Sequence, residues 1–363
     1  MGFDTFLGNP QAVAALREML RSGRLQGSFL FSGPEGVGKK TLATMVAKAR
    51  VCERLKDDFC GECARCRKAE EMFAAAREDM ARRREIKEAA RRVEGLVYFD
   101  FQLIEPITRY ILTEQIRQIR NVAYTRPFEF AQRIFIIDQA QWIHWQAVDL
   151  LLKVLEEPPE TTTFILVCPN AFELRPTIRS RCLRIPFLPV DEPTILSLLA
   201  RNKELPRAQS ALAARLAAGS VARALSFDPR EYELRRRPWV DFLDAVARPA
   251  PGSASLDWQQ LSAAARTLAE NREEFDQTLE IGYTLLRDLL QVLQGSVDAE
   301  VANLDLLPRL KAWASKLGWE RLEQLKTGLD QAHRLQIRNV NPQLGFETLA
   351  MDLAAIPPAN PHS

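Results

Sequence analysis

A glycine-rich loop that ends in a lysine is the feature that most constrains how this chain folds. Its defining residues are Gly33, Gly36, Gly38 and Lys39. The spacing fits G-x-x-x-x-G-K-[ST], in which backbone N–H groups bind phosphate oxygens and the lysine reaches the outer phosphates. Apolar residues at 27–32 predict a buried strand before the loop, and residues 41–50 have the periodicity of a helix after it. This context favours P-loop ancestry over the alternative, a glycine-rich turn that binds nothing, and leaves nucleotide binding by the present chain open.

One position in this loop departs from the motif. The residue after the P-loop lysine normally carries a hydroxyl group that binds Mg²⁺, and here it is Lys40. Thr41 cannot simply replace it, because one residue further along a helix points about 100° away. We therefore expect an NTPase scaffold without its metal ligand, which binds ATP or ADP weakly.

The composition bounds the class of protein. Hydrophobic residues make up 47% and charged residues 26% of the 363 residues, which is typical of a globular protein with two or three domains. The net charge of +2 argues against broad, non-specific attraction to nucleic acid. No signal peptide and no membrane-spanning apolar run is apparent, so we expect a cytoplasmic protein without a membrane partner.

Four of the six cysteines are clustered in the sequence, at Cys52, Cys60, Cys63 and Cys66. Four thiolates at this spacing suit a closed tetrahedral Zn²⁺ site, which is structural because no position stays open for catalysis. Two disulfides are the first alternative, and a reducing cytoplasm disfavours them. An iron–sulfur cluster is the second, since closely spaced cysteines also bind iron. We expect Cys168 and Cys182 to be small buried hydrophobic residues.

Two further segments complete the set of motifs. Residues 67–95 alternate basic and acidic side chains, which predicts a solvated helix or helical hairpin rather than a nucleic-acid arm. Residues 133–137 predict a buried strand that ends at Asp138, the position of the acid that helps hold Mg²⁺ in P-loop enzymes. The next residue is Gln139, whose amide cannot accept a proton from an attacking water. The changes at Lys40 and Gln139 together predict lost or feeble hydrolysis.

The order of these motifs resembles the clamp-loader branch of the AAA+ ATPases. Residues 151–159 (LLKVLEEPP) and 177–182 (TIRSRC) carry the resemblance most specifically, and it covers residues 3–70 and 97–190. This branch includes the gamma/tau and delta-prime subunits of bacterial DNA polymerase III. The resemblance implies an α/β P-loop (AAA+) domain with a parallel sheet and an inserted Cys₄ zinc module, followed by a small helical lid domain and an all-α C-terminal collar domain.

Within this branch the chain is more similar to delta-prime than to the motor subunit, which would keep a threonine at position 40 and a glutamate at position 139. The resemblance to delta-prime implies a mostly non-hydrolysing subunit that supplies an arginine finger to a neighbouring ATPase subunit. Arg181 matches that arginine, and a guanidinium inserted in trans neutralises charge on a γ-phosphate. Without the family match, an ordinary ion pair would be the better interpretation of Arg181.

The expected domains follow from the same resemblance. Arg223 matches the phosphate-sensing arginine of the lid, although an exposed helical arginine is nearly as good an interpretation. The sequence beyond residue 248 begins with a Pro/Gly/Ser-rich loop at 248–254 and then shows helical periodicity. The predicted domains are 1–188 (AAA+, with the zinc module at 52–66 and the charged insertion at 67–95), 189–240 (lid) and 241–363 (collar).

Three functions are consistent with the sequence. The first is a delta-prime-like clamp-loader subunit, part of the DNA polymerase III holoenzyme but not an active ATPase alone. Its partners would be the gamma/tau and delta subunits in a hetero-oligomeric ring, with the sliding clamp and primer-template DNA bound through the complex. The second is a gamma/tau-like ATPase motor of the same complex. The third is a zinc-dependent nucleic-acid-binding module on a P-loop scaffold that has lost its activity.

Overall fold

The computed structural model describes residues 2–88, 90–202, 205–247, 257–270, 274–295, 301–337 and 341–355. Its contacts divide the chain into two compact units. One unit comprises Met1–Asn202 with Ala217–Leu225, and the other comprises Lys203–Leu216 with Ser226–Ser363. Within the described ranges, no helix is both long enough and apolar enough to cross a membrane.

The first unit is built on a five-stranded parallel sheet with the strand order β2-β3-β4-β1-β5. The strands are β1 (Gly27–Ser32), β2 (Phe101–Ile104), β3 (Arg133–Ile137), β4 (Thr162–Cys168) and β5 (Leu183–Pro186). β1 and β3 confirm the strands expected at 27–32 and 133–137. β2 was not predicted, because its four residues are too short a run to stand out.

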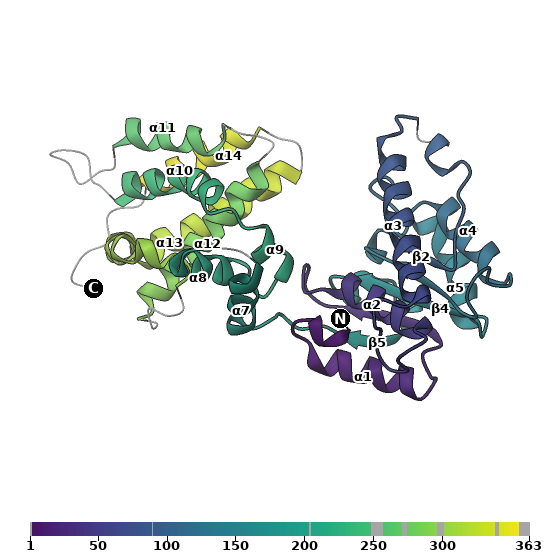
Figure 1. The fold of residues 1–363 in the computed structure, drawn as a ribbon. Helices are drawn as coiled ribbons and strands as arrows, with labels where there is room; N and C mark the ends of the chain where they lie inside the picture. Colours follow the sequence, from purple (N-terminus) through teal and green to yellow (C-terminus); the bar gives the residue numbers. More distant parts are fainter. Residues whose placement is uncertain are drawn as a thin grey trace. The chain divides into compact units, whose positions relative to one another are not determined.

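Helices cover both faces of this sheet (Figure 1). Successive side chains of a strand point to opposite faces, so Ile134 and Ile136 join one hydrophobic core while Phe135 and Ile137 join the other. The first core includes residues of α1, α2 and α3, and the second includes residues of α4 and α5. These layers confirm the predicted α/β class. The helices of this unit are α1 (Pro10–Arg21), α2 (Lys39–Val51), α3 (Ala64–Glu85), α4 (Thr113–Ala123), α5 (Val148–Glu156), α6 (Pro176–Arg179), α7 (Glu192–Asn202) and α9 (Val221–Ser226).

The charged insertion at 67–95 is less exposed than its sequence indicates. Most of it belongs to α3, which buries an apolar stripe at Ala69, Met72, Phe73, Ala76 and Met80. The prediction of a solvated helix is therefore wrong for one face. The charged residues between them mask this stripe in the sequence, although its spacing is helical.

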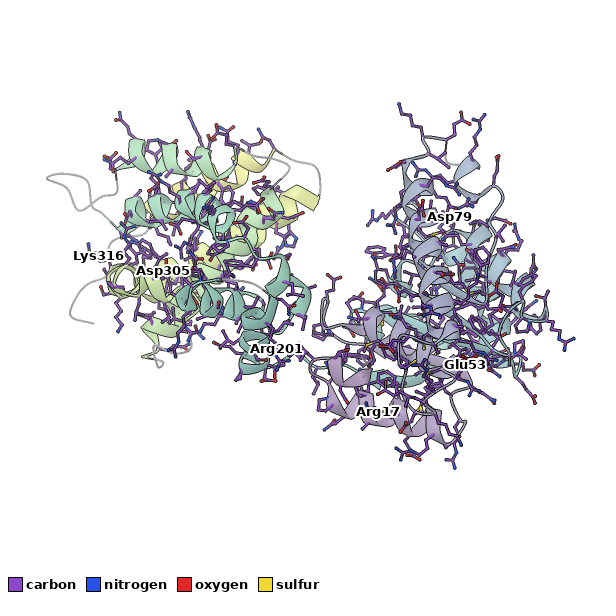
Figure 2. All side chains as sticks on the ribbon, viewed as in Figure 1. Arg17, Glu53, Asp79, Arg201, Asp305 and Lys316 are labelled. Atoms are coloured by element: carbon purple, nitrogen blue, oxygen red, sulfur yellow. The ribbon has the colours of Figure 1, made fainter. Side chains whose placement is uncertain are left out.

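The end of α3 is fixed by a buried arginine. Arg83 donates hydrogen bonds to Asp79, which is labelled in Figure 2, and to the backbone carbonyl groups of Arg92, Glu94 and Gly95. These bonds tie the chain after α3 back to the helix. The insertion is therefore an integral part of the first unit.

The second unit is helical, as expected for the C-terminal region. Its described helices are α8 (Arg207–Leu216), α10 (Pro229–Ala247), α11 (Trp258–Leu268), α12 (Phe275–Leu293), α13 (Leu307–Ile337) and α14 (Pro342–Ala355). α12, α13 and α14 pack together around one core (Figure 1). α13 is interrupted at Gly318, whose φ is 64°. Leu286 of α12 and Leu322 of α13, in the region predicted to be helical, are buried in this core.

The expected boundaries between lid and collar stay predictions. α9 belongs to the first unit, whereas α8 and α10 belong to the second, so both units include residues of the 189–240 segment. The Pro/Gly/Ser-rich loop at 248–254 lies outside the described residues.

Candidate functional site

The glycine-rich loop joins β1 to α2, and three of its glycines have positive φ angles. Gly33, Gly36 and Gly38 have φ angles of 154°, 75° and 94°, which L-residues rarely adopt. A Cβ atom on Gly33 would lie 2.2 Å from the carbonyl oxygen of Phe187. One on Gly36 would lie 2.0 Å from Ser220 Oγ, just before α9. The loop is therefore packed too closely for any other residue at these positions.

Lys39 begins α2 and points back into the loop. Its ammonium group donates hydrogen bonds to the carbonyl oxygens of Gly33 and Pro34. The side chain is buried, and this burial lowers the pKa of Lys39. A charged phosphate oxygen is a stronger hydrogen-bond acceptor than these neutral carbonyl groups. The ammonium group of Lys39 could therefore donate its hydrogen bonds to the phosphate of a ligand instead.

Lys40 turns toward the carboxyl ends of two strands. Its Nζ lies 2.8 Å from Oε1 of Glu105, which follows β2, and 3.0 Å from Oδ2 of Asp138, which follows β3. Burial disfavours the charged ammonium group, but the attraction of the two carboxylates outweighs it and raises the pKa of Lys40. The other oxygen of Glu105 lies 2.7 Å from Nη2 of Arg84. The lysine is therefore held as a cation between two acids.

Glu105 is the central acid of this network. Burial alone would raise the pKa of Glu105, but the hydrogen bond from Lys40 and the charges of Lys40 and Arg84 lower it. Neither Glu105 nor Arg84 was predicted from the sequence to belong to the site. Glu105 could have been found by recognising Phe101–Ile104 as a short strand, because an acid at the carboxyl end of a parallel strand faces the ligand side of the sheet.

Asp138 and Gln139 lie where the sequence places them, at the end of β3. Asp138 is buried, and its Oδ1 accepts a hydrogen bond from the backbone N–H of Gln139 at 3.0 Å. Gln139 has a left-handed backbone with φ of 54° and is exposed. The residue that would polarise an attacking water is therefore an amide.

A cavity of about 590 Å³ opens beside these groups. The predicted site residues that line it are Gly36, Gly38, Lys39, Lys40, Thr41 and Asp138. Val221, Ala222 and Leu225 of α9 line another side, and Arg223 is exposed on the same helix. A larger cavity of about 790 Å³ lies in the second unit, lined by parts of α8 and α10 and by Leu304. That larger cavity is lined by other residues than those predicted to bind a nucleotide, so the P-loop cavity is the candidate site.

Arg181 follows α6 and forms contacts on the protein surface. Its Nε donates to Glu156 Oε1 at 2.7 Å, and Nη1 donates to the carbonyl oxygen of Thr177 at 2.8 Å. Nη2 contacts the same oxygen of Glu156. The side chains of Arg181 and Glu156 are 30% and 48% exposed, so solvent reaches the pair. The guanidinium group is thus oriented but not buried.

The four clustered cysteines come together in space. Their Sγ atoms all lie within 4.8 Å of one another. A tetrahedral site with four thiolates about 2.3 Å from Zn²⁺ would separate the sulfur atoms by roughly 3.8 Å, so this donor set fits zinc. The four ligands of that site would be Cys52, Cys60, Cys63 and Cys66.

Backbone N–H groups donate hydrogen bonds to two sulfur atoms of this cluster. Cys60 Sγ accepts a hydrogen bond from the N–H of Cys63, and Cys63 Sγ accepts one from the N–H of Cys66 at the start of α3. Burial opposes the thiolate of Cys63, but hydrogen bonds from backbone N–H groups outweigh it and lower its pKa to about 6. The thiolate form is the one that binds metal ions. Of the remaining cysteines, Cys168 is buried as expected and Cys182 is only partly buried.

Comparison with known proteins identifies the family. The family described as "DNA polymerase III, delta subunit" matches residues 8–191, just over half of the chain. The chain belongs to the DNA polymerase III delta subunit family. The matched range contains the P-loop, the cysteine cluster and Arg181, and it confirms the predicted resemblance at the level of the clamp-loader AAA+ family.

Individual relatives are tau and gamma subunits of the same polymerase. The tau/gamma subunit of DNA polymerase III from Haemophilus influenzae is 30% identical over 230 residues, 62% of this chain and 30% of that protein. The tau subunit from Escherichia coli is 28% identical over 361 residues, 98% of this chain and 46% of that protein. The chain therefore spans less than half the length of these curated relatives. A gamma subunit-related protein of known structure from Thermotoga maritima has a TM-score of 0.41 at 15% identity and covers 94% of this chain and 98% of that one, a likeness too distant to support an inference.

Proposed function

We propose that this chain is a delta-prime-like subunit of the DNA polymerase III clamp-loader complex. In this role it helps to load the sliding clamp onto primed DNA and hydrolyses little or no ATP itself. The observation that carries the proposal is the 3.0 Å contact between Lys40 Nζ and Asp138 Oδ2, at the position where a motor subunit would bind Mg²⁺. Gln139 supports it, because an amide cannot act as the general base.

Arg181 would serve a neighbouring subunit instead of this chain's own pocket. Its planar donors match the oxygens of a phosphate, and its charge is permanent. The 30% exposure of its side chain supports this role, since a finger must be reachable from outside the chain. The gamma/tau and delta subunits are the proposed partners, joined through the helical region at 241–363. The sliding clamp and primer-template DNA would be bound through the complex.

The cysteine cluster would hold one structural Zn²⁺. The closeness of the four sulfur atoms supports this assignment. A closed Cys₄ site leaves no position for a substrate, so the metal would stabilise the segment between α2 and α3 and take no part in catalysis.

Reconstitution with gamma/tau and delta subunits tests the proposed role most directly. Rings that contain this chain should show primer-template-stimulated ATP hydrolysis and clamp loading, and rings without it should show much less. The isolated chain should turn over ATP at the background rate. Robust turnover by the isolated chain that disappears in Lys39→Ala would contradict the proposal.

The gamma/tau-like motor is the second candidate, and the identity of 28–30% to proteins with that name favours it. The turnover of the isolated chain separates the two, because only a motor hydrolyses ATP with its own pocket. The third candidate, a zinc-dependent nucleic-acid-binding module, predicts DNA binding by the isolated chain that weakens steeply with salt. The net charge of +2 gives this candidate little support.

A further inference from the structure

The position of a divalent cation in this P-loop is taken by a side chain of the protein. In P-loop NTPases, the residue after the lysine and the acid after the third strand hold Mg²⁺ together. Here these two positions contact each other, because Lys40 Nζ lies 3.0 Å from Asp138 Oδ2. The same ammonium group lies 2.8 Å from Glu105 Oε1. Mg²⁺ does not fit here, since the acids that would attract it already have a cation between them.

The charges around the pocket balance without a metal. Lys40 and Arg84 together offset the carboxylates of Glu105 and Asp138. Lys39 then adds a positive charge at the loop. The first N–H groups of α2 add to this field, because the helix begins after Gly38 without a side-chain cap. The pocket can therefore attract phosphate groups with the charges of the chain alone.

We propose that the Lys40 ammonium replaces the divalent cation of this P-loop, so that the cavity takes a phosphate-bearing ligand such as a nucleoside diphosphate without Mg²⁺. With a threonine at position 40, only Arg84 would remain to offset the carboxylates of Glu105 and Asp138, so one negative charge would face the phosphates and would need a metal ion to bridge it. Lys40 thus removes the requirement for metal in binding and, together with Gln139, the means of hydrolysis. This inference deepens the proposed function, because it makes the nucleotide a ligand that this subunit holds but does not consume.

Binding of ADP to the full-length isolated chain tests this inference, with excess EDTA in one titration and Mg²⁺ in the other. The wild-type affinity should differ by less than about twofold between the two conditions. Lys40→Thr should weaken ADP binding by at least about tenfold in EDTA, because a positive charge close to the phosphates is lost. Adding Mg²⁺ should restore the affinity of this variant for ADP. Lys40→Arg should behave like the wild type. Lys68→Thr, which removes a lysine from the surface of α3, is the matched control and should change nothing.

Three results would overturn the inference. They are loss of wild-type binding in EDTA, equal affinities of Lys40→Thr and the wild type in EDTA, and no binding of ADP by the wild type under either condition. The comparison of the wild type with and without Mg²⁺ needs no variant, so a Lys40 variant that fails to fold leaves the inference testable. Clamp loading is measured separately in the reconstituted ring, and its failure would refute the clamp-loader role without affecting the ADP result.

Discussion

Replacing Arg181 with alanine separates a role in the fold from a role in a neighbouring subunit. Within this chain, Arg181 makes an ion pair with Glu156 and donates hydrogen bonds to the carbonyl group of Thr177 and to Ser180 Oγ. The two side chains of the ion pair are 30% and 48% exposed. Exposed pairs of this kind contribute about 0.2–1 kcal/mol, so Arg181→Ala should lower the free energy of unfolding by about 1 kcal/mol or less. The melting temperature should fall by no more than about 4 °C.

The expected effect on catalysis in the ring is far larger. Arginine fingers supplied in trans accelerate phosphoryl transfer by about 10³- to 10⁵-fold, because the guanidinium group stabilises charge in the transition state. Arg181→Ala should therefore nearly abolish hydrolysis at the one site that receives the finger. Primer-template-stimulated ATP hydrolysis of the whole ring should fall accordingly, and clamp loading should fall with it. Ring assembly, measured by size-exclusion chromatography, should stay intact.

Two further variants control this experiment. Glu156→Gln breaks the ion pair within the chain but leaves the guanidinium group, so its rings should stay within about twofold of the wild-type rate. Arg181→Lys keeps the charge but loses the planar donors, and it should substitute poorly. If Arg181→Ala rings load clamps at the wild-type rate, the finger role is wrong. If Arg181→Ala fails to fold, the arginine is structural.

Three other predictions concern the metal, the core and the response to acid. Freshly reduced protein should contain about one zinc per chain by metal analysis, and the Cys63→Ser variant should contain no bound zinc. Finding iron, or no metal, in the wild-type protein would refute the zinc site. Asp100 is fully buried and accepts hydrogen bonds from three backbone N–H groups and from buried Arg133. Asp100→Ala should therefore lower the free energy of unfolding, measured by chemical denaturation, by about 3–5 kcal/mol. A decrease of less than about 1 kcal/mol would contradict this prediction. The folded pKa of Glu105 lies below its ordinary value of 4.5, so the stability that its ionised form contributes is present above pH 4.5 and is lost as the pH falls through the folded pKa. Glu105→Gln should remove that part of the acid dependence of the melting temperature. An unchanged profile would show that the ion pair of Glu105 with Lys40 is not stabilising.

The sequence by itself determined the features that depend on neighbouring residues. The P-loop, the strands at 27–32 and 133–137 and the cysteine cluster were all predicted from local patterns, and the structure has them within a residue or two. Such patterns are reliable because the glycines set the loop conformation directly, and a buried parallel strand needs a continuous apolar run. The loss of a hydroxyl group at Lys40 was equally plain in the sequence.

Only the tertiary structure decided what surrounds these features. Glu105 faces Lys40 because β2 lies beside β3 in the sheet, and no local pattern shows which strand ends will meet. The pairing of Arg181 with Glu156 likewise joins the end of α5 to the turn after α6. The apolar stripe of α3 is buried because β2 packs against this helix, and the sequence of α3 alone does not show that contact. In each case the decisive energy comes from contacts between residues far apart in the chain, so it depends on the packing of whole elements rather than on any segment alone.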